Sequence, residues 1–452
     1  MNDNKSKLCH LSTISAGCAI RSTSVRGYGT LAPTDSCCYH QRQGRSNSVK
    51  IDHIETINLC YQYPEVQRFQ YAGGVCTGRV TSLILVHTDT DQVGIGSCYS
   101  HPALVFLIVQ QQLDPMLRGE DPTDVESIWE KMYGITRWYG RKGAAMSALG
   151  GVDTALWDLK GKALGKPVRA LLGGETDSCP AYASGLLWND IDRLAAEAAQ
   201  HIDRGFRRVK MRLARSEQYD VAAVEAVRKA IGPDHDLMVD ASMRYHLDLA
   251  QRMGNFFRQQ KVYWYEEPFA PEDLDSFTAL RGVACGSDAV GVPLAAGENE
   301  FGLQGFRELM RVGAVDIVQP DASRCGGITE VARVARLAAE HKLRFATHSW
   351  SDAIAIVANA QVVSSFSNGI TVEIDRTGTP FIEDLLVEPL SVKDGLLMLS
   401  DAPGLGVELN NDVVQRLRMS DPLTIPDGSY SDMMFGKKFL PPSLPYAENS
   451  LT

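Results

Sequence analysis

The chain has 452 residues, enough for one large domain with a well-buried core or for two domains. Its composition, 44% hydrophobic and 22% charged residues, is that of a globular protein, and no apolar run approaches the ~20 residues that a membrane-spanning helix needs. The formal net charge of -10 argues against a general affinity for nucleic acid or anionic membranes. We therefore expect neither a nucleic acid nor a membrane among its partners.

The first part of the chain, residues 1–48, differs in composition from the rest. It is rich in Ser, Thr, Arg and Gly, contains only Asp3 and Asp35 as acids, and shows no periodic apolar pattern. This composition favours a disordered tail on a cytoplasmic protein. The alternative is a transit peptide, which is also rich in Arg and Ser and poor in acids, and which would direct the protein to an organelle.

A globular α+β segment is predicted over residues 49–175. Apolar alternation predicts two strands, at 49–60 and 79–87, and the Gly-rich segment 70–78 between them predicts a loop. Helical spacing of apolar residues follows at 103–118, 123–134 and 143–165. The last of these is the clearest helix, and Gly165-Lys166-Pro167 ends it.

From residue 176 to residue 392 the pattern becomes a regular alternation of strands and helices. Short apolar runs predict eight strands, at 180–184, 207–211, 236–240, 262–265, 292–296, 314–319, 343–347 and 369–374. Helical stretches separate most of them, at 190–204, 217–231, 244–260, 302–312 and 328–341. This order predicts a parallel barrel, with a doubly wound open sheet as the alternative that periodicity does not exclude.

Ionisable residues occur at one predicted strand end after another. Lys210 and Arg212 close the second strand, Asp240 ends the third, Glu266 and Glu267 end the fourth, Glu298 follows the fifth, Asp321 the sixth and His348 the seventh, and Glu373 lies in the eighth. Each alone is more often a solvated charge than a catalytic group. Because the carboxyl ends of barrel strands form one face, where active sites are built, the whole series predicts a site there.

Three of these carboxylates, Asp240, Glu266 and Glu298, would converge from neighbouring strands. Converging anions repel one another unless a cation neutralises them. Oxygen ligands without Cys or His suit a hard ion, so the set favours Mg²⁺ over Zn²⁺.

The remaining residues suggest anion binding and proton transfer. Lys210 and Arg212 lie two apart on one strand and so face the same side, where a substrate anion is their expected partner. Asp321 and His348 lie on adjacent strands, and a carboxylate bonded to one imidazole nitrogen fixes the tautomer and raises the basicity of the other. Together these groups provide what stabilising an enediolate requires.

From about residue 49 to 408 the chain resembles the enolase superfamily, and within it the mandelate racemase subgroup. The matching stretches are VKMR (209–212), MVDAS (238–242), WYEEP (264–268), AGEN (296–299), QPDASRCGG (319–327), ATH (346–348), VEID (372–375), the helix SALGGVDTALWDLKGK (147–162) and PGLGV (403–407). Each motif is weak alone, but their order and spacing together are specific.

The resemblance implies an α+β capping domain (49–175), a modified (β/α)₇β TIM-type barrel (176–392) and a C-terminal segment (393–452) that returns to the cap. It implies that Asp240, Glu266 and Glu298 are Mg²⁺ ligands, with Glu267 behind them, and that Asp321 orients His348 as the base. Lys210 would neutralise the substrate carboxylate, and Glu373, as the protonated acid, would hydrogen-bond its oxygen. We also expect a homo-oligomer, which is common for such barrels.

Arg212 departs from the subgroup pattern, in which a second lysine is frequent. Arginine is essentially never deprotonated in proteins, so it is a poor proton abstractor. This favours one-base chemistry at His348: removal of the proton alpha to a carboxylate, then loss of the beta hydroxyl, which converts an acid sugar (an aldonate or aldarate) to a 2-keto-3-deoxy acid. The alternatives are a sugar-lactone cycloisomerase and a hydroxy-acid racemase or epimerase.

Residues of the cap are expected to select the small carboxylate substrate. If the family arrangement holds, segments 65–78 and 97–102 cover the barrel mouth, with Arg68 and His101 as candidate contacts; for each, a solvated loop residue is an equally good interpretation. Trp350, after the seventh strand, either lines the pocket or packs locally.

Overall fold

The computed structural model describes residues 49–282, 291–420, 423–431 and 433–436. The predictions for residues 1–48 lie outside this part of the chain. Within it, no helix combines the length and the apolar composition needed to cross a lipid bilayer.

The N-terminal part contains a three-stranded antiparallel sheet in the order β1 (Ile51–Gln62), β4 (Gly78–Thr88) and β5 (Val93–Cys98). The two predicted strands are confirmed as β1 and β4. The predicted loop 70–78 instead contains a small hairpin, β2 (Phe69–Tyr71) and β3 (Gly74–Cys76), which follows the short 3-10 turn η1 (Glu65–Gln67).

Strand β5 was not predicted. Its two glycines weaken the apolar alternation typical of a strand, and they also allow β5 to lie close to a helix. A Cβ atom on Gly96 would lie 2.1 Å from the carbonyl oxygen of Gly151, and one on Gly94 would lie 2.2 Å from that of Ala155. Only glycine allows this approach of β5 to helix α4 (Ala144–Leu164).

Helices cover one face of this sheet. The stretch predicted as a single helix at 103–118 consists of α1 (Pro102–Ile108), a π-helical turn η2 (Val109–Leu113) and α2 (Asp114–Leu117), followed by α3 (Val125–Thr136). Helix α4 is buried on almost all sides because it lies between the sheet and the barrel. Its Asp153 carboxylate accepts hydrogen bonds from the backbone N–H and the hydroxyl of Thr329 in α11, at 2.9 and 2.6 Å. The short helix α5 (Val168–Leu171) leads to the barrel.

All eight predicted barrel strands are present: β6 (Ser178–Ser184), β7 (Arg208–Arg212), β8 (Asp236–Asp240), β9 (Trp264–Glu266), β10 (Leu294–Ala296), β11 (Ile317–Val318), β12 (Arg344–Thr347) and β13 (Gly369–Asp375). Each pairs in parallel with the next, and β13 pairs in parallel with β6, Val372 opposite Ala181. This last pairing closes the barrel and excludes the open sheet.

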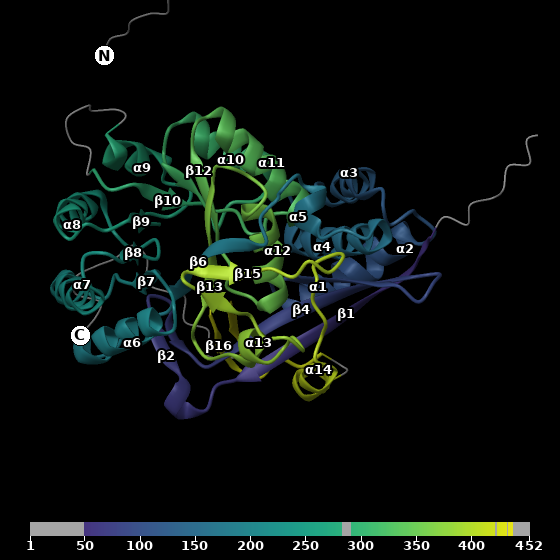
Figure 1. Cartoon of the computed structure of the whole chain (residues 1–452), viewed down its shortest axis with the longest axis horizontal. Helices are drawn as coiled ribbons and strands as arrows, with labels where there is room; N and C mark the ends of the chain where they lie inside the picture. The colour runs from purple at the N-terminus through teal and green to yellow at the C-terminus, as the bar shows by residue number, and fades with distance from the viewer. Residues whose placement is uncertain (1–48, 283–290, 421–422, 432, 437–452) are drawn as a thin grey trace, which may run out of the picture. The chain divides into compact units, whose positions relative to one another are not determined.

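Seven helices connect the eight strands and surround them in Figure 1: α6 (Ile191–Asp203), α7 (Glu217–Ile231), α8 (Leu247–Gln259), α9 (Leu274–Arg281), α10 (Gly302–Arg311), α11 (Gly327–Glu340) and α12 (Ala353–Val363). Most have one apolar face, turned to the strands. Inside the barrel, one side chain from each of six strands forms a buried layer, comprising Tyr182, Met238, Trp264, Ala295, Ile317 and Ala346. The fold is therefore a (β/α)₇β barrel with a strand-rich N-terminal cap.

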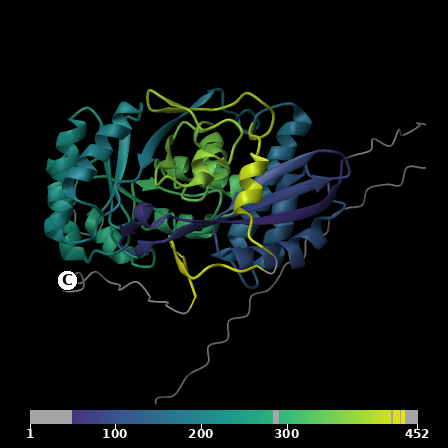
Figure 2. The ribbon, with the colours of Figure 1, turned by 90° about the horizontal axis from the view of Figure 1, so that it is seen from below.

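The chain after β13 continues through α13 (Pro380–Glu383) and returns along both parts. Strand β15 (Leu396–Met398) pairs with β14 (Val392–Lys393) and antiparallel with β6. Helix α14 (Asn411–Leu417) packs against β1 and is seen beside the long cap strands in Figure 2. The hairpin of β16 (Gly428–Tyr430) and β17 (Met433–Phe435) then packs against β3 and β4.

Candidate active site

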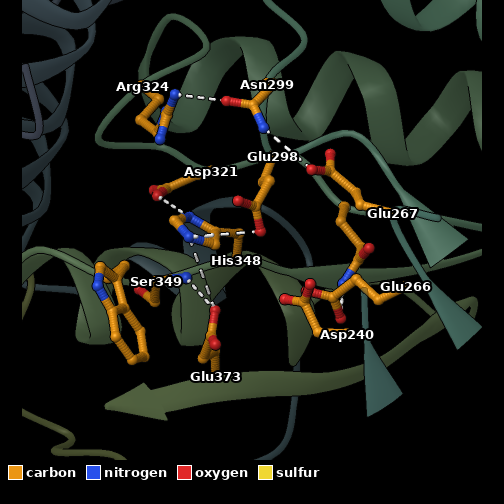
Figure 3. A network of polar contacts seen from close by, with 12 residues as sticks. Asp240, Glu266, Glu267, Glu298, Asn299, Asp321, Arg324, His348, Ser349 and Glu373 are labelled. Atoms are coloured by element: carbon orange, nitrogen blue, oxygen red, sulfur yellow. Dashed lines mark hydrogen bonds and ion pairs between the residues drawn. The ribbon is translucent and has the colours of Figure 1, made fainter. Parts of the chain in front are cut away.

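The three carboxylates predicted to converge do so at the carboxyl ends of adjacent strands. Asp240 is the last residue of β8, Glu266 is the last residue of β9, and Glu298 follows β10 by two residues. One oxygen from each lies within 4.8 Å of the others. Figure 3 shows the three side chains beside His348. Asp240 and Glu266 are buried, and Glu298 is nearly so.

This group fits a hard divalent cation. All three donors are carboxylate oxygens, which Mg²⁺ prefers, and neither Cys nor His is among them. The Oε2 atom of Glu298 is buried and has no hydrogen-bond partner among the described residues. A buried carboxylate oxygen without a partner is costly, and a bound cation would satisfy it.

Glu266 is fixed by neighbours that the sequence did not identify. Its Oε2 atom accepts hydrogen bonds from Nε1 of Trp264 at 2.9 Å and from Nε2 of Gln319 at 2.8 Å. Its Oε1 atom accepts from Lys210. These three hydrogen bonds hold the Glu266 carboxylate in one orientation at the end of β9. Trp264 and Gln319 begin stretches that carry the family resemblance, WYEEP and QPDASRCGG, but neither was assigned a role from the sequence.

The two predicted cations, Lys210 and Arg212, lie among these carboxylates. Nζ of Lys210 contacts Glu266, lies 2.9 Å from Oε1 of Glu373, and lies 3.7 Å from Oδ2 of Asp240. Arg212 pairs with Asp240, and its guanidinium lies over the ring of Trp350, 4.9 Å from the ring centre. Both cations lie near Asp240 and Glu373, on the same side of β7, as their spacing predicted.

His348 and Asp321 form the predicted pair. Nδ1 of His348 lies 2.8 Å from Oδ2 of Asp321, and because a carboxylate can only accept, Nδ1 is the donor and Nε2 is left facing the carboxylate group. Nε2 lies 3.7 Å from Oε2 of Glu298 and 4.0 Å from Oε2 of Glu373.

A network that the sequence did not predict orients this pair. Oδ1 of Asp321 accepts from the backbone N–H and hydroxyl of Ser323, both at 2.8 Å, and from Nδ2 of Asn359 at 3.0 Å. Asn359 also donates to the backbone oxygen of His348 at 3.1 Å. The signal available was a fully buried amide, Asn359, in helix α12 (Ala353–Val363), whose other residues are apolar except for the amide Gln361.

The surrounding carboxylates change the acid strength of His348. Burial by itself lowers its pKa, but Glu298, the hydrogen bond to Asp321 and Glu373 together raise the pKa to about 9. Among the groups that raise the pKa of His348, Glu298 has the largest effect. A cation bound to Glu298 would lower this pKa again.

The charges around Glu373 favour its ionised form. Burial raises its pKa, but the charges of Lys210, His348 and Arg212 outweigh burial and hold the pKa well below its ordinary value. Its Oε2 atom also accepts the backbone N–H of Ser349 at 2.9 Å.

Glu267, which follows Glu266, lies outside the converging group, and burial and the nearby charges of Glu298 and Glu266 raise its pKa well above the ordinary value. Its Oε2 atom accepts from Nδ2 of Asn299 at 3.0 Å, and Arg324 donates to Oδ1 of the same amide, also at 3.0 Å. Glu267 thus belongs to a chain of contacts behind Glu298.

A cavity of about 240 Å³ opens onto this group. Its lining includes the barrel residues Arg212, Glu298, His348 and Trp350, together with cap residues and two residues of the C-terminal hairpin. The cap contribution is Phe69, Tyr71, Ala72 and Gly73, so the segment 65–78 reaches the barrel mouth as expected. Neither Arg68 nor His101, the two candidate contacts, is part of the lining.

Comparison with known proteins identifies the family. Residues 56–173 match the mandelate racemase / muconate lactonizing enzyme N-terminal domain, and residues 193–413 match the enolase C-terminal domain-like family. The chain is 36% identical over 357 residues to the D-galactarolactone cycloisomerase of Agrobacterium fabrum, covering 76% of this chain and 93% of that protein.

Further relatives include enzymes with a different reaction. The arabinonate dehydratase of Saccharolobus solfataricus is 29% identical, over 81% of this chain and 99% of its own length. The crystal structure of a racemase from Streptomyces coelicolor with bound magnesium superimposes with a TM-score of 0.74 at 29% identity, covering 82% of this chain and all of that one. The chain belongs to the enolase superfamily and is similar to its mandelate racemase-like enzymes.

Proposed function

We propose that this enolase-superfamily enzyme removes the proton alpha to the carboxylate of an acid sugar and then eliminates the beta hydroxyl, yielding a 2-keto-3-deoxy acid. The observation that carries the proposal is the position of the imidazole beside the carboxylate group, with Nε2 of His348 3.7 Å from Oε2 of Glu298 in one cavity. A base next to a site for a divalent cation is suited to acidifying a carbon next to a carboxylate.

We assign Asp240, Glu266 and Glu298 as the residues that would hold Mg²⁺. When bound there, the ion supplies positive charge to the substrate carboxylate and so lowers the cost of the negative charge that develops as the alpha proton leaves. Lys210, buried at the same place, binds the same carboxylate as a fixed cation. The magnesium in the structurally similar racemase supports this choice of ion.

His348 takes the alpha proton on Nε2, because Nδ1 is occupied by Asp321. The charge of Asp321 then stabilises the resulting imidazolium. In the second step this imidazolium returns the proton to the beta hydroxyl, which leaves as water. One residue thus serves as base and then as acid, and Asp321 holds it in one orientation for both steps.

Arg212 supports elimination over racemisation. Racemisation needs a competent base on each face of the substrate, and a guanidinium provides almost no neutral form at pH 7. Its contacts with Asp240 and with the ring of Trp350 hold it as a fixed positive charge at the cavity wall.

A second candidate is the opening of a sugar lactone by the same proton abstraction, with a ring oxygen as the leaving group. The observation that favours it is the 36% identity to a D-galactarolactone cycloisomerase, which exceeds the 29% identity to the arabinonate dehydratase. Both reactions require the same carboxylates and the same base.

The test is to screen aldonates, aldarates and their lactones with added Mg²⁺, using a 2-keto-acid assay and NMR of the products. Dehydratase activity predicts a 2-keto-3-deoxy acid from an open acid sugar. If only lactones are turned over, the cycloisomerase proposal holds and the dehydratase proposal is wrong. If no acid sugar and no lactone reacts, or exchanges its alpha proton in D₂O, both candidates are wrong.

A further inference from the structure

We propose that the C-terminal hairpin β16–β17 is part of the substrate site, and that the hydroxyl of Ser431 recognises a hydroxyl group of the acid sugar far from the reacting carboxylate. The proposal rests on the function proposed above and adds a residue that determines specificity. Ser431 and Met434 line the same cavity as His348 and Glu298, although they follow His348 by about 80 residues in the chain.

The hairpin is held against the cap by specific contacts. The backbone N–H of Thr77 donates to the carbonyl oxygen of Ser429 at 2.7 Å, and the N–H of Ser429 donates to the hydroxyl of Thr77 at 3.1 Å. The N–H of Ser431 donates to Sγ of Cys76 at 3.3 Å, and the ring of Tyr430 is fully buried. The position of Ser431 is therefore fixed by the cap.

The Ser431 hydroxyl is also oriented. Nε1 of Trp350 donates a 2.8 Å hydrogen bond to Oγ of Ser431. An indole N–H can only donate, so it occupies one of the acceptor sites of the hydroxyl and leaves the hydroxyl proton to be donated elsewhere. Because Ser431 lines the cavity and is only 4% exposed, a ligand bound in the cavity would lie within reach of this proton.

The surroundings of Ser431 make such a contact selective. Besides its charged residues, the lining of the cavity contains the apolar side chains of Phe69, Leu187 and Met434 and the indole of Trp350, which contacts Ser431. A polar group placed in an apolar wall discriminates strongly against ligands that leave it unpaired. A polyhydroxylated acid satisfies Ser431, whereas a deoxygenated analogue does not.

The hairpin lies beyond the part of the chain that the family comparison covers, which ends at residue 413. The hairpin contacts the barrel through Trp350, which follows His348 by two residues, so it reaches the loop that carries the base.

The test compares Ser431→Gly with Ser429→Ala. Ser431 has a φ of 55°, a left-handed conformation that glycine adopts without strain, so glycine removes the hydroxyl without straining the turn. Ser429 is the matched control, because its buried Oγ has no hydrogen-bond partner among the described residues. Each protein is assayed on the active acid sugar and on analogues deoxygenated at single distal carbons.

We expect Ser431→Gly to lower kcat/KM on the intact sugar about tenfold, mainly through KM, and Ser429→Ala to leave it unchanged. With one particular deoxy analogue, wild type and Ser431→Gly should react equally well, because the recognised hydroxyl is absent. Unchanged kcat/KM in Ser431→Gly, or an equal loss on every analogue, would overturn the proposal. A wild-type enzyme inactive on all acid sugars would instead reject the proposed function.

Discussion

The His348 imidazole and the Asp321 carboxylate are joined by a 2.8 Å contact between Nδ1 and Oδ2. The two residues follow the neighbouring strands β12 and β11, and Asn359 donates both to Asp321 and to the backbone oxygen of His348. Helix α12, which carries Asn359, thus holds both members of the pair in place. The geometry of the pair leaves only Nε2 to face the cavity, which makes the role of His348 testable by substitution.

Replacing His348 with Asn should abolish exchange of the substrate alpha proton in D₂O, because the base is lost. The expected reduction is about 10²- to 10⁴-fold, the usual contribution of a general base. Mg²⁺ binding, measured by calorimetry, should remain nearly intact. The control is His341→Asn, at an exposed histidine, which should exchange normally. If His348→Asn exchanges the proton at the wild-type rate, another residue is the base, and Lys210 is the first to examine.

Removal of divalent cations with EDTA should abolish turnover, and added Mg²⁺ should restore it. The reason is the convergence of Asp240, Glu266 and Glu298, whose mutual repulsion a cation relieves. The readouts are the 2-keto-acid assay and direct titration of Mg²⁺ into the stripped protein. Full activity in protein shown to be free of metal would contradict the assignment of these ligands.

Substituting Gln319 by Leu should weaken Mg²⁺ binding by roughly 10- to 100-fold, because Glu266 loses one of the donors that orient it. Calorimetric titration measures this independently of turnover. Gln304→Leu, at an exposed position of α10, serves as the control. An unchanged Mg²⁺ affinity in Gln319→Leu would show that Trp264 and Lys210 suffice to fix Glu266.

The reaction should proceed on one face of the substrate, because Arg212 cannot act as a second base. NMR of the reaction with the active acid sugar should show a 2-keto-3-deoxy acid accumulating and no epimer at the alpha carbon. Arg212→Ala should reduce kcat/KM through the loss of a fixed positive charge, without changing the product. An epimer as the main product would reveal a second base and would reject the dehydratase proposal.

Asp153 should make the stability of the protein depend on pH. Burial raises its pKa to about 7 in the folded protein, from an ordinary value of 3.8. The folded state therefore holds this proton more tightly than the unfolded state, so the stabilising contribution is complete below about pH 4 and is lost as pH rises to about 7.

Urea unfolding of wild type and Asp153→Asn between pH 4 and 8 tests this, because asparagine does not titrate. The variant should gain stability relative to wild type as pH rises, by an amount on the order of a few kcal/mol. A difference in unfolding free energy that stays constant with pH would show that Asp153 is ionised throughout.

The sequence by itself determined most of the local elements of the barrel. All eight barrel strands were predicted, because each is a short apolar run whose pattern depends only on neighbouring residues. The ionisable residues at the strand ends were identified for the same reason, since strand position fixes which end of the barrel they reach. Local pattern failed at β5, whose glycines are required by the distant helix α4.

Only the tertiary structure showed that the strands form a closed barrel and which residues hydrogen-bond to the site residues. The pairing of β13 with β6 joins residues about 190 positions apart, and no local pattern distinguishes it from an open sheet. The roles of Gln319 and Asn359 could not be predicted, because their hydrogen bonds to Glu266 and Asp321 cross between elements. Ser431 reaches the cavity only because the chain returns to the cap. Such a contact joins residues far apart in the sequence, so no local pattern predicts it.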